Sequence, residues 1–210
     1  MAEFRRPRAP SGSKQPTDTP ASPSAPAARK RGRGQKAPLT SEQAVYEYAV
    51  SSLARRAKTV VQLRRVLRPR VEPGEAGAAF IEAAIGRLKE HGYLSDVRFA
   101  QGYAGARMTQ SRLGRRRVAQ ELLQKGVQPD LVEREVAVAF AETDDLTQAR
   151  AFLAKKRVRP PTDQRDAARI FRMLARAGFG GGTAVQVLRQ LRAGPDAASL
   201  SDLGEVADLD

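Results

Sequence analysis

Basic side chains gather in four clusters along the middle of the chain, and the chemistry that they offer is the binding of anions. The clusters are Arg64, Arg65, Arg68 and Arg70; Arg107, Arg112, Arg115, Arg116 and Arg117; Lys155, Lys156, Arg157 and Arg159; and Arg165, Arg169, Arg172 and Arg176. The last four recur with the spacing of one helical stripe. For any single arginine, a solvated helix face is the better interpretation. For the whole set, an anionic partner is the better one.

Charge is distributed unevenly over the 210 residues, because residues 41–193 alone carry a net +12 of the total +14. Residues 1–40 hold nine basic and two acidic residues and seven of the 13 prolines, which predicts a disordered basic tail rich in Pro, Ala and Ser. Residues 194–210 hold five acidic residues and no basic one, which predicts a disordered acidic tail. Two interpretations of that tail stay open: it folds back on the basic body, or it is simply solvated.

The composition excludes several classes of site. The chain has no cysteine and one histidine, His91, so thiolate metal sites, disulfides and multi-histidine sites are excluded, and a Ser-His-Asp hydrolase is improbable. The acidic pairs Asp144-Asp145 and Glu133/Glu135 have no nucleophile or histidine beside them. The sequence also lacks an apolar run of about 18 residues, the length that spans a membrane. We therefore expect a cytoplasmic protein with no metal site and no segment that spans a membrane.

Apolar residues recur at helical spacing throughout residues 41–193, and alternating strand patterns are absent, so the fold class is predicted to be all-α. Thr59, Ser95 and Asp163 are favoured residue types for the start of a helix. Three glycines at positions 92, 126 and 178 fit the left-handed position that follows a helix. The pattern predicts about nine helices of roughly 10–18 residues. The glycine-rich run at 178–182 is interpreted as a turn, with the next helix from Thr183.

Two segments of the chain repeat one another. Residues 118–127, VAQELLQKGV, align without a gap on residues 170–179, IFRMLARAGF, so that Gly126 matches Gly178 at an offset of 52. An earlier copy begins at Leu63, but its turn has lost the glycine and contains Pro69. The pattern predicts three three-helix repeats, over residues 41–93, 94–142 and 143–193, in an elongated, slightly curved array between the two tails.

The stretch from Leu94 to Val127 resembles the RecX family of bacterial recombination regulators. The matching motif residues include Lys125 and the structural positions Leu94, Asp96, Phe99, Tyr103, Gly114, Glu121, Leu122 and Gly126, with Gly178 in the next repeat. Glu121 is interpreted as a helix cap, and Phe99 and Leu122 as core residues. Arg107 has two open interpretations, a pair with an acid such as Asp96 or Glu121, or a partner contact. Lys125 joins the basic clusters as a candidate contact to a partner or to DNA.

The resemblance implies a function in homologous recombination and DNA repair. Proteins of this family bind the RecA recombinase filament on single-stranded DNA and depress its ATPase activity, its strand exchange and the coprotease activity that triggers the SOS response. The resemblance implies a non-catalytic regulator without cofactors. We further expect a monomer that also binds single- or double-stranded DNA weakly. The alternatives are a stand-alone DNA-binding protein built from three-helix units and, more remotely, an enzyme.

Overall fold

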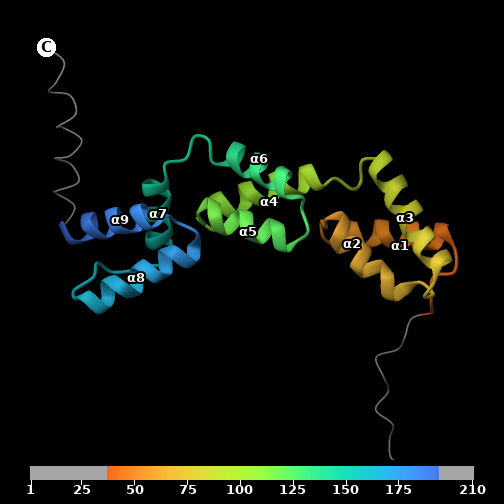
Figure 1. Cartoon of the computed structure of the whole chain (residues 1–210), viewed down its shortest axis with the longest axis horizontal. Helices are drawn as coiled ribbons and strands as arrows, with labels where there is room; N and C mark the ends of the chain where they lie inside the picture. The colour runs from red at the N-terminus through yellow and green to blue at the C-terminus, as the bar shows by residue number, and fades with distance from the viewer. Residues whose placement is uncertain (1–36, 194–210) are drawn as a thin grey trace, which may run out of the picture. The chain divides into compact units, whose positions relative to one another are not determined.

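The computed structural model describes residues 37–193, and this part of the chain contains nine α-helices and no β-strand (Figure 1). The all-α prediction is therefore confirmed. The helices are α1 (Glu42–Arg55), α2 (Val60–Leu67), α3 (Glu75–Glu90), α4 (Asp96–Thr109), α5 (Arg115–Gln124), α6 (Pro129–Ala139), α7 (Asp145–Lys155), α8 (Gln164–Ala177) and α9 (Gly181–Ala193), with a 3-10 turn η1 (Arg68–Arg70) after α2. Residues 1–36 and 194–210, most of the predicted basic tail and all of the predicted acidic tail, lie outside the described residues.

The predicted caps, the glycines that follow helices and the proline that ends one are confirmed. The side chains of Thr59, Ser95 and Asp163 accept hydrogen bonds from the backbone N–H three residues on, so each caps a helix. Glycines 92, 126 and 178 have φ of +69°, +81° and +95°. Pro69 ends α2 at Leu67, because proline lacks the N–H that a continued helix needs and η1 forms instead. The prediction for the last helix was wrong by two residues, since α9 begins at Gly181 rather than Thr183.

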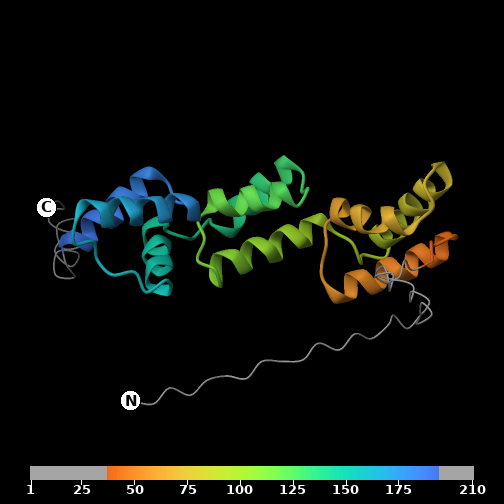
Figure 2. The ribbon, with the colours of Figure 1, turned by 90° about the horizontal axis from the view of Figure 1, so that it is seen from below.

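The helices share three hydrophobic cores, and each core is made by three consecutive helices. Leu63, Leu67 and Leu88 belong to the core of α1–α3. The core of α4–α6 is centred on Val118, Leu122 and Phe140, and that of α7–α9 on Phe152, Ile170 and Leu174. Figure 2 shows the three groups in orange to yellow, green, and blue-green to blue. That each group is a separate repeat, with the limits given above, stays a prediction.

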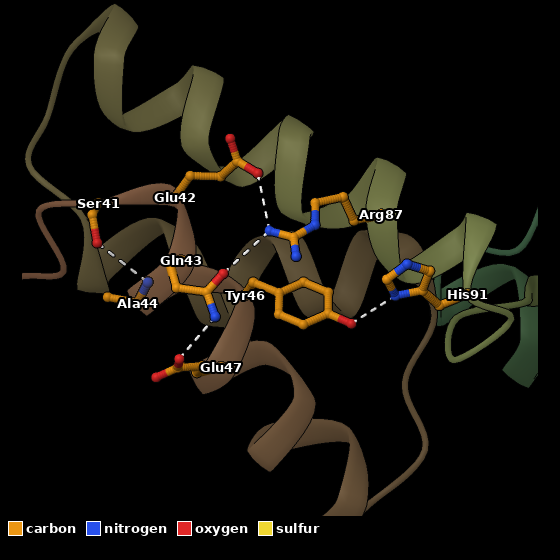
Figure 3. Close-up of polar contacts among 8 residues, drawn as sticks. All are labelled: Ser41, Glu42, Gln43, Ala44, Tyr46, Glu47, Arg87 and His91. Atoms are coloured by element: carbon orange, nitrogen blue, oxygen red, sulfur yellow. Dashed lines mark hydrogen bonds and ion pairs between the residues drawn. The ribbon is translucent and has the colours of Figure 1, made fainter.

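Polar contacts tie α1 to α3 on the surface of the first group (Figure 3). The guanidinium of Arg87 donates to the carboxylate of Glu42 at 3.3 Å and lies 4.2 Å from the ring centre of Tyr46. The hydroxyl of Tyr46 lies 2.9 Å from Nδ1 of His91, at the end of α3. His91 is thereby explained as part of the packing of α3 on α1.

Ordered structure begins before the predicted limit at residue 40. The backbone N–H of Leu39 donates to the carbonyl of Arg70 at 2.7 Å, and the Leu39 side chain packs against the first core. The extended segment at Leu39 gives the carbonyl of Arg70 a hydrogen-bond donor and places an apolar side chain on the first core, so the segment packs with this group.

Candidate interaction surface

The first and second groups meet where α2 begins and α5 ends. The hydroxyl of Thr59, which caps α2, donates to the carbonyl of Lys125 at 2.6 Å. The N–H of Val60 donates to the carboxylate of Asp96 at 2.9 Å. A Cβ on Gly126 would lie 2.7 Å from the Cβ of Val61, closer than side chains ever approach. Gly126 is therefore required twice, for its positive φ and for this close approach.

The second and third groups meet in the same way, where α5 begins and α8 ends. Gly114, at the start of α5, donates its N–H to the carbonyl of Ala177 at 2.9 Å. A Cβ on Gly178 would lie 2.3 Å from the backbone nitrogen of Arg117. Thr59 and Gly114 hold equivalent positions, as do Lys125 and Ala177. The same contact between a helix start and a helix end therefore occurs twice, and we call its two copies the α2–α5 joint and the α5–α8 joint.

The first group explains why its own copy of the sequence repeat has lost the glycine. Arg70 aligns with Lys125 and Ala177, and its carbonyl accepts the N–H of Leu39 rather than that of a preceding repeat. Val71, at the glycine position, has an ordinary φ of −108° and forms an isolated bridge with Leu39. Because a short extended segment covers this end in place of a helix start, no glycine is needed there.

Glu121 is the centre of a charged network on α4 and α5. Its carboxylate accepts a hydrogen bond from the hydroxyl of Tyr103 at 2.6 Å and one from Nε of Arg117 at 3.0 Å. Nε of Arg107 lies 2.9 Å away as an ion-pair partner, and Arg107 also donates to the Tyr103 hydroxyl at 2.8 Å. The ammonium of Lys125 lies 4.9 Å from the Tyr103 ring centre. The interpretation of Glu121 as a cap was wrong, because it lies near the end of α5 and binds side chains.

This network sets the protonation of its members. Burial raises the pKa of Glu121, but the hydrogen bonds from Tyr103 and Arg117 and the charge of Arg107 outweigh it, so the pKa of Glu121 lies below its usual value. Burial and the hydrogen bond to Glu121 raise the pKa of Tyr103 above its usual value. At neutral pH the network therefore holds a carboxylate and a neutral phenol. The network therefore holds the side chains of Arg107 and Arg117 in position.

A hollow of about 530 Å³ lies where α5, α7 and α8 come together. Exposed Lys156, Arg169 and Arg176 and half-buried Arg117 surround it, whereas buried Phe152 and Ala177 and half-buried Leu113 and Met173 form its apolar lining. The one acidic side chain of the lining is Glu121, and the network already engages both of its oxygens. We call this feature the basic hollow. Arg169 pairs with Asp166 at 3.3 Å and Arg117 pairs with Glu121, so Lys156 and Arg176 are the basic residues of the hollow that form no ion pair within residues 37–193. They offer positive charge beside an apolar surface.

The structure brings four of the predicted contact residues together at the basic hollow, from three of the four sequence clusters. Others are engaged elsewhere: Arg64 pairs with Glu82 at 2.7 Å, Arg115 with Asp145 at 3.5 Å, and Lys155 donates to the carbonyl of Gln110. The remainder are exposed and form no ion pair within residues 37–193, namely Arg65, Arg68, Arg112, Arg116, Arg165 and Arg172.

The motif residues lie where they hold the second group together. Leu94 and Leu122 are buried, and half-buried Phe99 stacks on Tyr103 at 5.8 Å between ring centres. Sequence reasoning named Gly114, Gly126 and Gly178 as structural residues but missed the contacts that they make at the two joints, and it missed the apolar lining of the basic hollow. The offset of 52 between the repeats was the available signal for the joints, because equivalent residues make equivalent contacts.

Comparison with known proteins agrees with these observations. Residues 95–134 match the family model described as "RecX, second three-helix domain". The regulatory protein RecX of Myxococcus xanthus is 35% identical over 174 residues, covering 76% of this chain and 92% of that protein. The regulatory protein RecX of Chromobacterium violaceum is 36% identical over 146 residues, covering 70% and 87%.

Solved structures show the same fold at lower sequence identity. The crystal structure of RecX from Lactobacillus salivarius gives a TM-score of 0.54 at 16% identity, over 73% of this chain and 97% of that one. A second structure of a regulatory protein RecX gives 0.58 at 17% identity. None of the described helices has both the length and the apolar character that crossing a membrane demands. From the extent and identity of the relatives, this chain belongs to the RecX family of regulatory proteins.

Proposed function

We propose that this chain binds the RecA recombinase filament on single-stranded DNA and lowers its ATPase activity, its strand exchange and its SOS coprotease activity. Membership of the family supports the regulatory role. The observation on this chain that carries the binding proposal is the basic hollow, with Lys156, Arg169 and Arg176 around an apolar lining. Such a surface fits acidic and apolar side chains of a protein better than it fits phosphates alone.

The proposed mechanism is binding alone, with no chemical step and no cofactor. A filament presents the same surface many times, and three helix groups linked through the α2–α5 and α5–α8 joints can contact several of its subunits. Modest contacts of linked groups add up to tight binding through effective concentration. A single copy of the chain is sufficient for this. It acts in the cytoplasm, where the filament forms.

The test is co-sedimentation of the purified chain with RecA assembled on single-stranded DNA and ATP, beside DNA-only and RecA-only controls, at two salt concentrations. We expect binding to the filament well above the DNA-only level, together with reduced ATP hydrolysis. Both effects should weaken as salt rises, because charge attracts the partners. Equal binding to naked DNA and to the filament, with ATP hydrolysis unchanged, contradicts the proposal.

A second function, direct binding of DNA, is favoured by the exposed arginines outside the basic hollow. Arg65, Arg68, Arg112 and Arg116 lie on the first two groups and form no ion pair among the described residues. Arginines of this kind bind phosphates without reading sequence. We expect weak binding of single- and double-stranded DNA, and the DNA-only control measures it.

A further inference from the structure

The basic hollow is selective in its chemistry, because charge and apolar surface lie side by side in it. Phosphates of a nucleic acid backbone can pair with Lys156 and Arg176 but leave the apolar lining in contact with water. An acidic peptide with apolar side chains satisfies both. The chemistry of the hollow therefore selects a peptide that alternates acidic and apolar residues.

The chain itself contains such a peptide. Residues 194–210 contain five acidic residues and no basic one. Leu203, Val206 and Leu209 follow one another at intervals of three, each next to or near an acidic residue. In a helical conformation this spacing puts the three apolar side chains toward one side, with Asp202, Glu205 and Asp208 beside them.

The length of chain between α9 and this peptide suffices to reach the hollow. Near the end of α9, Gln190 accepts a hydrogen bond from Arg150 of α7 at 2.9 Å. Lys156 lies six residues further along the chain from Arg150, about 9 Å at the rise of a helix. Residues 194–199 can span about 20 Å when extended. The acidic segment can thus begin beside the hollow.

We infer that the acidic C-terminal segment, residues 200–210, occupies the basic hollow, with its carboxylates at Lys156 and Arg176 and beside Arg169, and with its apolar side chains on the lining. This goes beyond the proposed function and rests on it in one respect only, namely that the segment then competes with the filament for the hollow. If the segment occupies the hollow for most of the time, it lowers the apparent affinity for the filament about four- to tenfold.

Paramagnetic relaxation tests the occupancy without any recombinase. The chain has no cysteine, so Ala207→Cys creates a single site for a nitroxide label in the full-length protein. We expect strong broadening of the amide signals of Leu113, Lys156 and Met173 at low salt, and little at Val45 or Leu63 of the first group. Broadening that is uniform, that is absent or that peaks elsewhere overturns the inference. So does broadening that appears only between labelled and unlabelled copies, which would indicate a second copy as the occupant.

Two sets of substitutions separate charge from apolar contact. D202N/E205Q/D208N removes three carboxylates, and we expect it to abolish the broadening and to raise filament affinity about four- to tenfold. L203S/V206S keeps every charge, and we expect it to weaken the broadening several-fold. Unchanged broadening in either variant overturns docking in the hollow. Because the relaxation experiment contains no filament, its failure is distinct from a failure of the proposed function.

Discussion

The carboxylate of Glu121 holds side chains of α4 and α5 together. A carboxylate near the end of a helix is poorly placed to cap it, and here it collects Tyr103, Arg107 and Arg117 instead. The Glu121 side chain is only 14% exposed, so its interactions are screened less than those of surface pairs. The pair with Arg107 was among the sequence-based interpretations, whereas the hydrogen bond from Tyr103 was not, because both partners lie 18 residues apart on different helices.

Glu121→Gln should destabilise the fold by about 1–3 kcal/mol at pH 7, because two arginines lose their carboxylate. The pKa of Glu121 is lowered in the folded state, so its contribution is present above the pKa of the unfolded chain and is lost as pH falls through the lower folded value. The wild-type advantage should therefore shrink as the pH falls from 7 toward 3. Urea unfolding at several pH values measures it, and a pH-independent difference would contradict the network.

Thr59 has two roles, and Ser95, which has only one of them, serves as its control. Its hydroxyl caps α2 and also bonds to Lys125 across the α2–α5 joint, whereas Ser95 only caps α4. We expect Ser95→Ala to cost about 1 kcal/mol of unfolding free energy and Thr59→Ala about 2–3 kcal/mol, since the part-buried carbonyl of Lys125 also loses its donor. Denaturant melts of both variants compare them, and equal losses would show that the joint bond contributes nothing.

Among the helices, the recurring joint explains which glycines the fold needs. The sequence was sufficient to predict the glycines that end helices, because a positive φ has a clear residue preference. It was not sufficient to predict that Gly114 and Gly178 lie against each other, because that contact joins residues far apart in the chain. Nor did it distinguish these from Gly102 and Gly105 inside α4, where an added Cβ meets nothing within 4 Å.

Gly178→Ala should destabilise the protein by more than about 2 kcal/mol, because an alanine there has both an unfavourable φ and a clash with the Arg117 backbone. Gly102→Ala is the control, and it should stabilise α4 by about 0.5–1 kcal/mol, since glycine is a poor helix former and the space is open. Thermal unfolding of the two variants measures whether each is less or more stable than the wild type. A tolerated alanine at position 178 would contradict the α5–α8 joint.

For the molecule as a whole, fold class and the excess of positive charge followed from the sequence, whereas the location of the binding surface did not. Four arginines on one stripe of α8 look equivalent in the sequence, but Arg169 and Arg176 line the basic hollow and Arg165 and Arg172 do not. The difference is one of helix face, because Arg169 and Arg176 lie toward the side of α8 that carries Met173 and Ala177, whereas Arg165 and Arg172 lie toward the other edge of the stripe. The charge clusters in the sequence thus predict an anionic partner, whereas the packing of the helices determines which of the basic residues lie together on one surface.

The most direct test of binding through the basic hollow compares two double charge reversals in filament co-sedimentation. R169E/R176E changes the hollow, and R189E/R192E makes the same change in charge on exposed residues of α9 outside it. We predict that R169E/R176E weakens binding at least tenfold, the equivalent of about 1.4 kcal/mol, and that R189E/R192E weakens it little. Circular dichroism should show that both variants stay folded. Equal losses in the two variants would contradict a specific surface and indicate diffuse electrostatic attraction.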